Sequence, residues 1–375
     1  MSIFDRKPTL RWAVPVTAAV VLTAGGAAAG AITASARTGL PHRSAAQLLV
    51  DVQNARVDGL SGTIVQNADL GLPSLPGVNG DGGSGSSDMS SLVSGSHTLR
   101  LWYAGPSHVR LALLGSLGES DIIRNGSDLW TWSSSSKSAS HLTLPASQKG
   151  TSPDATPTTG ATPSTPQQAA DMALKAIAPS TKVSTDGTAV VAGRSAYELL
   201  LQPRDPASLV SSVQIAIDGA THVPTRVQVF AKGKSSPAFQ VGFTSFDPTA
   251  PGSELFRFNP PPGTKVTQDK GAMGMMGLPS APHAAGKNAS EPNVVGKGWT
   301  SVVVAKVPQQ AAGSKGSSGG NGLTQMLQAL PPVSGSWGSG HLLQGTLFSA
   351  VLTNDGRVAV GAVPPRMLYD ALAAR

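Results

Sequence analysis

The sequence predicts a mainly β (α+β) fold: a curved antiparallel sheet with short covering helices, followed by a small C-terminal α+β region. Segments in which apolar and polar residues alternate follow one another closely, as in an antiparallel meander. Turn-forming pairs such as Asn125-Gly126 and Asp218-Gly219 separate these segments. Pro260–Pro262 end the pattern, because proline cannot donate a hydrogen bond to a neighbouring strand.

The first half of the pattern begins with an amphipathic helix. Apolar residues recur with helical spacing between residues 41 and 57, and Ser44 is well placed to cap that helix. Alternation then predicts strands near residues 60–66, 97–103, 109–113, 122–132 (a hairpin around the Asn-Gly turn) and 141–144.

The second half repeats this order of a helix followed by strands. Thr165 and the proline after it predict the start of a helix, which Pro179 ends. Phe256-Arg257-Phe258 is predicted as the last strand, with both phenylalanines closing the sheet. The strands expected before it lie near residues 197–201, 213–217, 227–229 and 239–243.

The C-terminal region has its own, shorter set of elements. We expect a strand at 299–304, a helix at 323–330, strands at 342–353 and 357–363, and a final helix at 367–373. Asp355-Gly356 is the expected turn between the last two strands.

Composition divides the chain into parts. We predict an N-terminal targeting segment (1–37), a main domain (38–266), a linker (267–293) and a small C-terminal region (294–375). Residues 71–96 are rich in Gly and Ser, and residues 146–165 in Thr, Pro and Ser, so both are expected to be flexible insertions in the main domain.

The N-terminus carries a targeting signal. Basic residues precede an uncharged stretch from Trp12 to Ala36, which is longer than the usual apolar part of a cleaved signal peptide. Its length favours an anchor in the cytoplasmic membrane, whereas Ala34-Ser35-Ala36 is typical of a cleavage site. Both alternatives place the rest of the chain outside the cytoplasmic membrane, either anchored or secreted.

Charge and residue types limit the function. The net charge is +7, but Lys and Arg are scattered and form no nucleic-acid-binding motif, so no nucleic-acid partner is expected. The chain has no cysteine, which excludes disulfides and thiol chemistry. The histidines and carboxylates show no catalytic or metal-ligand spacing, so we predict no enzyme activity, no metal site and no cofactor.

The positive signal is an apolar sheet face. If the short helices cover it incompletely, an apolar concavity remains that suits acyl chains, although an ordinary packed core explains the same pattern. The candidate cavity residues, taken as one apolar face of successive strands, are Leu101, Leu111, Ile123, Trp130, Leu199, Ile215, Val229 and Phe243.

Three ordered motifs resemble the LolA/RseB-like superfamily of bacterial lipoprotein carriers and envelope sensors. The resemblance covers roughly residues 40–266, including the helix at 44–57 and a "G-x-x-x-W" strand. The matching positions are Gly193, Tyr197 and Leu199; Asp218, Pro224, Arg226 and Val227; Phe256, Phe258, Pro260, Pro261 and Gly263; and Gly126 with Trp130.

This resemblance implies a half-open antiparallel β-barrel whose helices line the mouth of an apolar cavity for acyl chains. It also implies that the protein is not an enzyme. RseB-like members carry a second, smaller C-terminal domain and regulate an anti-sigma factor, a place that residues 294–366 could fill.

The expected function is therefore extracytoplasmic binding of lipid or lipoprotein acyl chains. The alternative is an envelope sensor that binds an anti-sigma factor or another membrane-bound regulator. If the segment Trp12–Ala36 stays attached to the membrane, a fixed sensor or acceptor fits better than a shuttle.

Overall fold

The computed structural model describes residues 39–72, 87, 91–92, 94–116, 118–144, 177–268, 292–306 and 329–374. The segment Trp12–Ala36 and the insertion 146–165 lie outside these ranges, as does most of the helices expected at 165–178 and 323–330. None of the helices within them combines the length and hydrophobicity that a membrane crossing requires.

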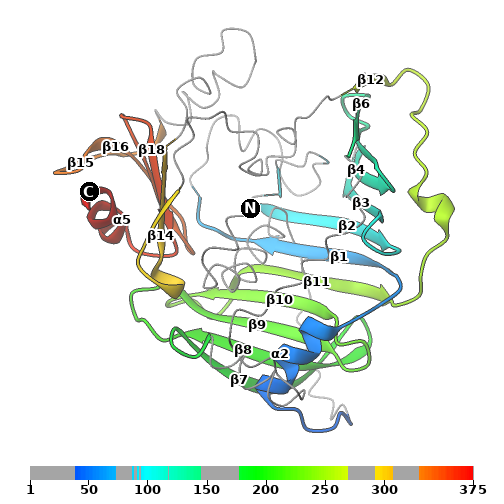
Figure 1. The fold of residues 1–375 in the computed structure, drawn as a ribbon, viewed down its shortest axis with the longest axis horizontal. Helices are drawn as coiled ribbons and strands as arrows, with labels where there is room; N and C mark the ends of the chain where they lie inside the picture. The colour runs from blue at the N-terminus through cyan, green and yellow to red at the C-terminus, as the bar shows by residue number, and fades with distance from the viewer. Residues whose placement is uncertain are drawn as a thin grey trace, which may run out of the picture.

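One long, curved sheet dominates the fold (Figure 1). Its twelve strands follow the order β12-β6-β5-β4-β3-β2-β1-β11-β10-β9-β8-β7, and all neighbours except β12 and β6 are antiparallel. The mainly β fold class is thereby confirmed. The strands are β1 (Leu60–Ala68), β2 (Gly95–Tyr103), β3 (His108–Gly115), β4 (Gly118–Asn125), β5 (Asp128–Ser133), β6 (Ser138–Thr143), β7 (Thr181–Val191), β8 (Arg194–Pro203), β9 (Val210–Asp218), β10 (Pro224–Ala231), β11 (Pro237–Asp247) and β12 (Lys265–Gln268).

The sheet consists of two meanders that meet at β1 and β11. Strands β1 to β6 lie side by side in chain order, and so do β7 to β11. The pairing of β1 with β11 joins the two sets, and its register shifts between Thr63 and Ile64. The strands predicted between residues 60 and 243 are confirmed. The turn at Gly126 is confirmed as well, and its φ of 64° lies in the left-handed region.

Helix α2 (Ala45–Asn54) precedes β1 and begins at the predicted cap. Ser44 Oγ accepts the Gln47 backbone N–H, and Gln47 Oε1 accepts the Ser44 backbone N–H, which forms a capping box. The capping box fixes the start of the helix, which packs on β8 and β9.

The C-terminal region forms a separate six-stranded sheet covered by one helix, α5 (Pro365–Ala373). Val302, Val351, Leu368 and Leu372 form its core between sheet and helix. The strands, in the order β13-β14-β18-β17-β16-β15, are β13 (Asn293–Val295), β14 (Val302–Lys306), β15 (Pro332–Gly335), β16 (Gly338–Gln344), β17 (Ser349–Thr353) and β18 (Arg357–Gly361). The expected strand 342–353 is thus a hairpin, whereas the final helix is confirmed.

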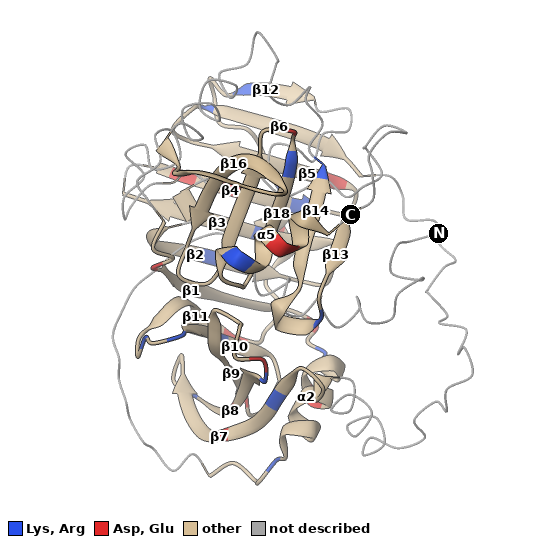
Figure 2. Ribbon diagram, turned by 90° about the vertical axis from the view of Figure 1, so that its left-hand side faces the viewer, with Lys and Arg blue, Asp and Glu red and all other residues tan. Residues whose placement is uncertain are grey.

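Hydrogen bonds join the C-terminal region to the rest of the protein at two places. Trp299 Nε1 donates to Thr181 Oγ1 at 2.8 Å, and the Thr346 backbone N–H donates to the Leu70 carbonyl at 2.7 Å. Figures 1 and 2 place α5 on the side of the small sheet that faces away from the large sheet.

The expected last strand at Phe256-Arg257-Phe258 is not formed. The 3₁₀ helix η4 (Ser253–Phe256) occupies part of it, inside a connection of residues 248–264 that we call the strap. In Figure 1 the strap runs along the outer side of the sheet to β12, which pairs in parallel with β6. The phenylalanines therefore close the sheet by packing across it, not by adding a strand.

Two further elements of the large sheet were not predicted. β7 was missed because its sequence, TKVSTDGTAVV, is largely polar and contains a glycine. β12 extends the large sheet to Gln268, just beyond the expected domain boundary at 266. The division into domains itself stays a prediction.

A buried carboxylate organises the turn between β9 and β10. The Asp218 side chain is 1% exposed, and its oxygens accept hydrogen bonds from Arg194 at 2.7 and 3.0 Å and from the Thr221 backbone and hydroxyl at 2.8 Å. Burial opposes ionisation, but the bonds from Arg194 and Thr221 outweigh it and lower the pKa of Asp218 to about 2.

Replacing Asp218 with Asn should destabilise the protein by about 2–3 kcal/mol at neutral pH. A carboxyl group whose pKa is lowered in the folded state stabilises that state at pH values above the pKa of the group in the unfolded chain. The difference between the variant and the wild type in the free energy of unfolding should shrink as pH falls from about 4 towards 2. In this range Asp218 of the wild type becomes protonated in the folded state as well as in the unfolded state. Urea unfolding at pH 7 and at the lowest pH that keeps the protein folded measures both values.

The matched control is Asp186→Asn, because Asp186 is an exposed aspartate on β7. This variant should unfold within about 0.5 kcal/mol of the wild type. Equal effects of the two substitutions would show that Asp218 has no special role in the turn.

Candidate functional site

Cross-strand register divides the side chains of the large sheet between two faces, because directly opposed residues in antiparallel strands point to the same side. Leu101 on β2 lies opposite Leu111 on β3. Phe243 on β11 lies opposite Ile64 on β1, which in turn lies opposite Leu99 on β2. These side chains share one side, which we call the apolar face.

The apolar face continues through the second meander. Val229 on β10 lies opposite Phe239 on β11. Ile215 on β9 lies between Val227 and Leu199, one on each neighbouring strand. The predicted residues that share the apolar face are Leu101, Leu111, Leu199, Ile215, Val229 and Phe243.

The other two predicted residues lie on the opposite face. Leu111 pairs with Ile122, not with Ile123. Ile123 pairs instead with Arg110 and with Trp130, so both Ile123 and Trp130 point away from the apolar face. The expectation of one common face was wrong for these two residues. We call their side the strap face, because the strap crosses it.

Helix α2 covers one end of the apolar face. Leu48 of the helix is fully buried against Tyr197, Leu199 and Ile217, and Ile215 packs at the edge of this cluster. Leu199 is only 2% exposed. At this end, the predicted ligand-binding residues belong to a packed core, which was the alternative explanation of their pattern.

The other end of the apolar face is covered by Leu92, which packs on Leu99 and Leu113. Residue 92 lies inside the expected flexible insertion 71–96, so that insertion contributes to the core. Between the two covered ends, apolar side chains remain half-exposed across four adjacent strands: Leu101, Ile64, Phe243, Val241, Val227 and Val229. We call this set the central band.

Two residues of β1 shape the central band. At Gly62, a Cβ atom would come within 2.7 Å of Phe243 Cδ1, so only glycine lets this ring lie over the strand. Gln66 lies opposite Val241 and is 1% exposed, and its Nε2 atom has no hydrogen-bond partner. A buried amide without a partner is costly, which makes it a candidate ligand contact.

The strap face has different chemistry. Phe256 packs edge-on against His108, with ring centroids 5.6 Å apart. Phe258 lies against Trp130, at a centroid distance of 5.2 Å, and near Trp132. The strap therefore covers this side of the first meander with aromatic contacts, each worth about 0.5–1.5 kcal/mol beyond burial.

The same face carries a contact between Arg110 and the buried carboxyl group of Asp121. Arg110 donates to Asp121 Oδ2 at 2.5 Å and to Glu119 Oε1 at 3.3 Å. Burial raises the pKa of Asp121 to about 7, and hydrogen bonding to Glu119 adds to the rise, although Arg110 opposes it. Asp121 Oδ1 and Trp132 Nε1 are both buried without a hydrogen-bond partner.

Two further carboxylates, Glu198 and Asp205, have partners within the protein. Glu198 accepts from Arg226 at 2.5 Å, and Asp205 accepts from Thr300 Oγ1 at 3.1 Å. Within the ranges that the structure describes, no group of three or more His, Asp or Glu side chains could hold a metal ion.

Several solved structures are similar to this chain. MucB of Pseudomonas aeruginosa, in complex with MucA, is 14% identical, with a TM-score of 0.42 over 88% of this chain and 96% of that one. A LolA superfamily protein from Nitrosomonas europaea is 12% identical (TM-score 0.21; 58% and 99% covered), and so is the Mycobacterium tuberculosis lipoprotein LppX (TM-score 0.26; 52% and 88% covered). No protein-family model and no curated protein matches the sequence.

One of these proteins carries the name of the superfamily that the sequence motifs resemble. Low identities and TM-scores below 0.5 transfer no function from these proteins. The function has to be argued from the residues of this chain.

The buried Asp121 predicts a pH dependence of stability. Its pKa is raised in the folded state, so that state keeps a proton that the unfolded chain releases between about pH 4 and 7. The free energy of unfolding should therefore fall as pH rises through this window, by at most about 1.4 kcal/mol per pH unit from this group. Urea unfolding at intervals between pH 4 and 8 gives the slope.

Asp121→Asn should remove this contribution, whereas Asp58→Asn, at an exposed aspartate, should leave the slope as in the wild type. An unchanged slope in the Asp121→Asn variant would mean that this carboxyl is ionised in the folded protein throughout the window.

Proposed function

We propose that this chain is a non-enzymatic, extracytoplasmic protein that binds acyl chains of a lipid or lipoprotein on the central band of its apolar face. One observation carries the proposal. The band is apolar and half-exposed across four adjacent strands, between two ends that are closed by α2 and by Leu92. Such a surface gains free energy when an apolar ligand covers it.

The magnitudes favour a long apolar chain. Each buried methylene contributes about 0.8 kcal/mol, so an acyl chain that lies along the band gains several kcal/mol from a few carbons. Gln66 lies next to the band, opposite Val241, and its unpartnered amide would donate a hydrogen bond to an ester or amide carbonyl of a ligand that reaches it. The band would thus bind the acyl chain and its linkage together.

The sequence supports the proposed location. The uncharged stretch Trp12–Ala36 after basic residues is typical of an export signal or membrane anchor. An extracytoplasmic protein held at the cytoplasmic membrane would have its apolar face within reach of membrane lipids and lipoproteins.

Replacing Leu101 with Asp should lower the uptake of a fluorescent fatty acid by about tenfold or more, because a carboxylate in the band would have to lose water when the acyl chain covers it. Fluorescence titration of the full-length chain measures the affinity. Native mass spectrometry of wild-type protein purified from an envelope fraction should show a bound lipid of defined mass.

The matched control is Gln214→Asp, which places the same charge on β9 but on the opposite face, since Gln214 lies opposite Gln228 there. Its uptake should equal that of the wild type. An unchanged melting temperature would show that the Leu101→Asp variant is folded. If this folded variant takes up the fatty acid as well as the wild type does, the central band is not the binding site.

A second candidate function rests on the small sheet. Val294 and Val303 are 42% and 36% exposed, and they lie opposite each other on β13 and β14. Val303 also pairs with Val360, on the face that does not carry the α5 core. An exposed apolar patch of this kind suits a protein partner, such as a membrane-bound regulator.

Val303→Lys should then abolish cross-linking of the full chain to a membrane protein in intact cells while fatty-acid uptake stays unchanged. Lys297→Ala, a change at an exposed residue of the same region, serves as the control. Unchanged cross-linking in the Val303→Lys variant would contradict a partner site on this face.

A further inference from the structure

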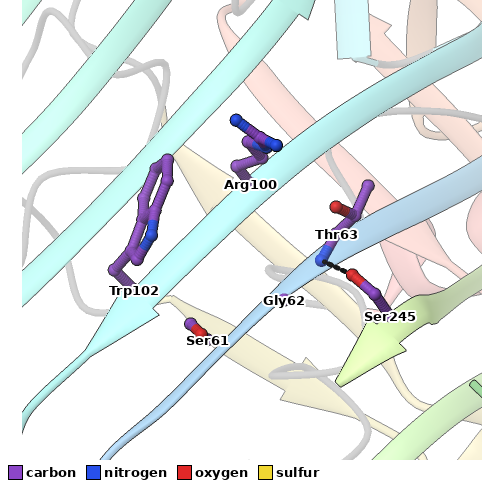
Figure 3. A pocket seen from close by; sticks show the side chains of 6 residues that line it. All are labelled: Ser61, Gly62, Thr63, Arg100, Trp102 and Ser245. Atoms are coloured by element: carbon purple, nitrogen blue, oxygen red, sulfur yellow. Dashed lines mark hydrogen bonds between the residues drawn. The ribbon is translucent and has the colours of Figure 1, made fainter. Parts of the chain in front are cut away.

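A hollow of about 240 Å³ lies where β1, β2 and β11 meet. Figure 3 shows its wall: Arg100 and Trp102 project from β2, Thr63 and Ser61 from β1, and Ser245 from β11. Thr63 lies opposite both Arg100 and Ser245, so these side chains share a face. Trp102 lies opposite Arg110, which assigns the hollow to the strap face, on the other side of the sheet from the central band.

Arg100 supplies an uncommitted positive charge. Its side chain is exposed, and no carboxylate among the described residues lies within ion-pair distance of it. Arg110, in contrast, is held by Asp121 and Glu119, with its guanidinium 5.4 Å from the centre of the Trp102 ring. The charge of Arg100 is therefore available to a ligand.

Hydroxyl groups complete the polar wall. The register shift in β1 directs the Thr63 backbone N–H to Ser245 Oγ, at 3.0 Å. Because Ser245 Oγ accepts this bond, its own hydrogen remains free to be donated into the hollow. Ser61 and Thr63 add two more hydroxyls.

The carboxylate next along β11 does not line the hollow. Asp247 lies opposite Ser61, and its Oδ1 atom accepts the Thr249 backbone N–H at 2.9 Å. The lining thus combines one guanidinium, three hydroxyls and an indole ring, with no negative charge.

We propose that this hollow binds a phosphate monoester or diester of headgroup size. A guanidinium matches phosphate oxygens in a two-pronged geometry, and hydroxyl donors satisfy the remaining oxygens. The indole of Trp102 covers the carbon skeleton of the ester. The volume is below the roughly 300–1,000 Å³ of drug-sized sites, which suits a glycerol phosphate group and excludes a whole lipid.

The site goes beyond the acyl-binding function and does not depend on it, because the two surfaces lie on opposite faces of the sheet. The phosphate ester has two possible sources, a soluble metabolite or the headgroup of a membrane lipid. The same chemistry recognises both, and the experiment distinguishes them.

The test uses the full-length chain in detergent. Isothermal titration with inorganic phosphate and with glycerol 3-phosphate should show saturable binding, with glycerol 3-phosphate the tighter of the two. Arg100→Gln should weaken this binding by about tenfold, the loss expected for one charged hydrogen-bonding group. Arg366→Gln, which removes an exposed arginine on α5, should leave it within about twofold of the wild type.

Co-sedimentation with vesicles identifies the source. Binding to phosphatidylglycerol vesicles that Arg100→Gln weakens would assign the site to a lipid headgroup. If Arg100→Gln weakens the binding of the soluble esters but does not change the binding of vesicles, the site is assigned to a free ester. Affinities that are equal in the wild type and Arg100→Gln, or the absence of saturable binding to both soluble esters and vesicles, would overturn the proposal. Fatty-acid uptake by Arg100→Gln should stay unchanged in every case, which separates this test from that of the acyl site.

Discussion

The antiparallel pairing of β1 with β11 joins two local meanders into one sheet, and both candidate binding surfaces lie at this junction. On one side, Ile64 and Phe243 connect the apolar residues of the first meander to those of the second. On the other side, the register shift at Thr63 turns a backbone N–H towards Ser245 and shapes the polar hollow. Without this pairing, neither surface would be continuous.

The two faces of the sheet differ because different parts of the chain cover them. The amphipathic helix α2 brings Leu48 against the apolar face and closes one end of it. The strap brings Phe256 against His108, and Phe258 against Trp130 and Trp132, on the other face. Each cover leaves part of its face accessible: the central band on one side and the hollow near Trp102 on the other.

Local sequence signals predicted most of the elements of the fold. Ser44 caps α2 as expected, and Gly126 adopts the backbone conformation that its turn requires. These features depend on a few neighbouring residues, so the sequence carries them directly. The eight predicted site residues were chosen from the alternation of apolar and polar residues. Within one strand, this alternation is sufficient to tell which side chains share a face.

Features that depend on distant parts of the chain were not predictable in this way. Two isoleucines adjoin at Ile122 and Ile123, so alternation alone cannot tell which one faces Leu111, and the β3–β4 turn decides it. Phe256 and Phe258 have the spacing expected of a strand. However, β3 and β5, on which their rings pack, are already paired with a strand on each side. The phenylalanines therefore cover these strands and do not pair with them. The hollow near Arg100 combines residues from three strands that only the β1–β11 pairing brings together.

The strap also has a consequence for the order in which the chain folds. Thr63 and Ser245 are 182 positions apart, and His141 and Gln268 are 127 apart, so the centre and one edge of the sheet close late. The hairpins from β2 to β6 involve only near neighbours and form fast, whereas contacts between distant segments form slowly. Until β11 and the strap have been synthesised, β1 is an unpaired edge and Trp130 and Trp132 lack their cover. Such an intermediate presents a strand edge to other chains, so this architecture makes slow, assisted folding an inherent property of the molecule.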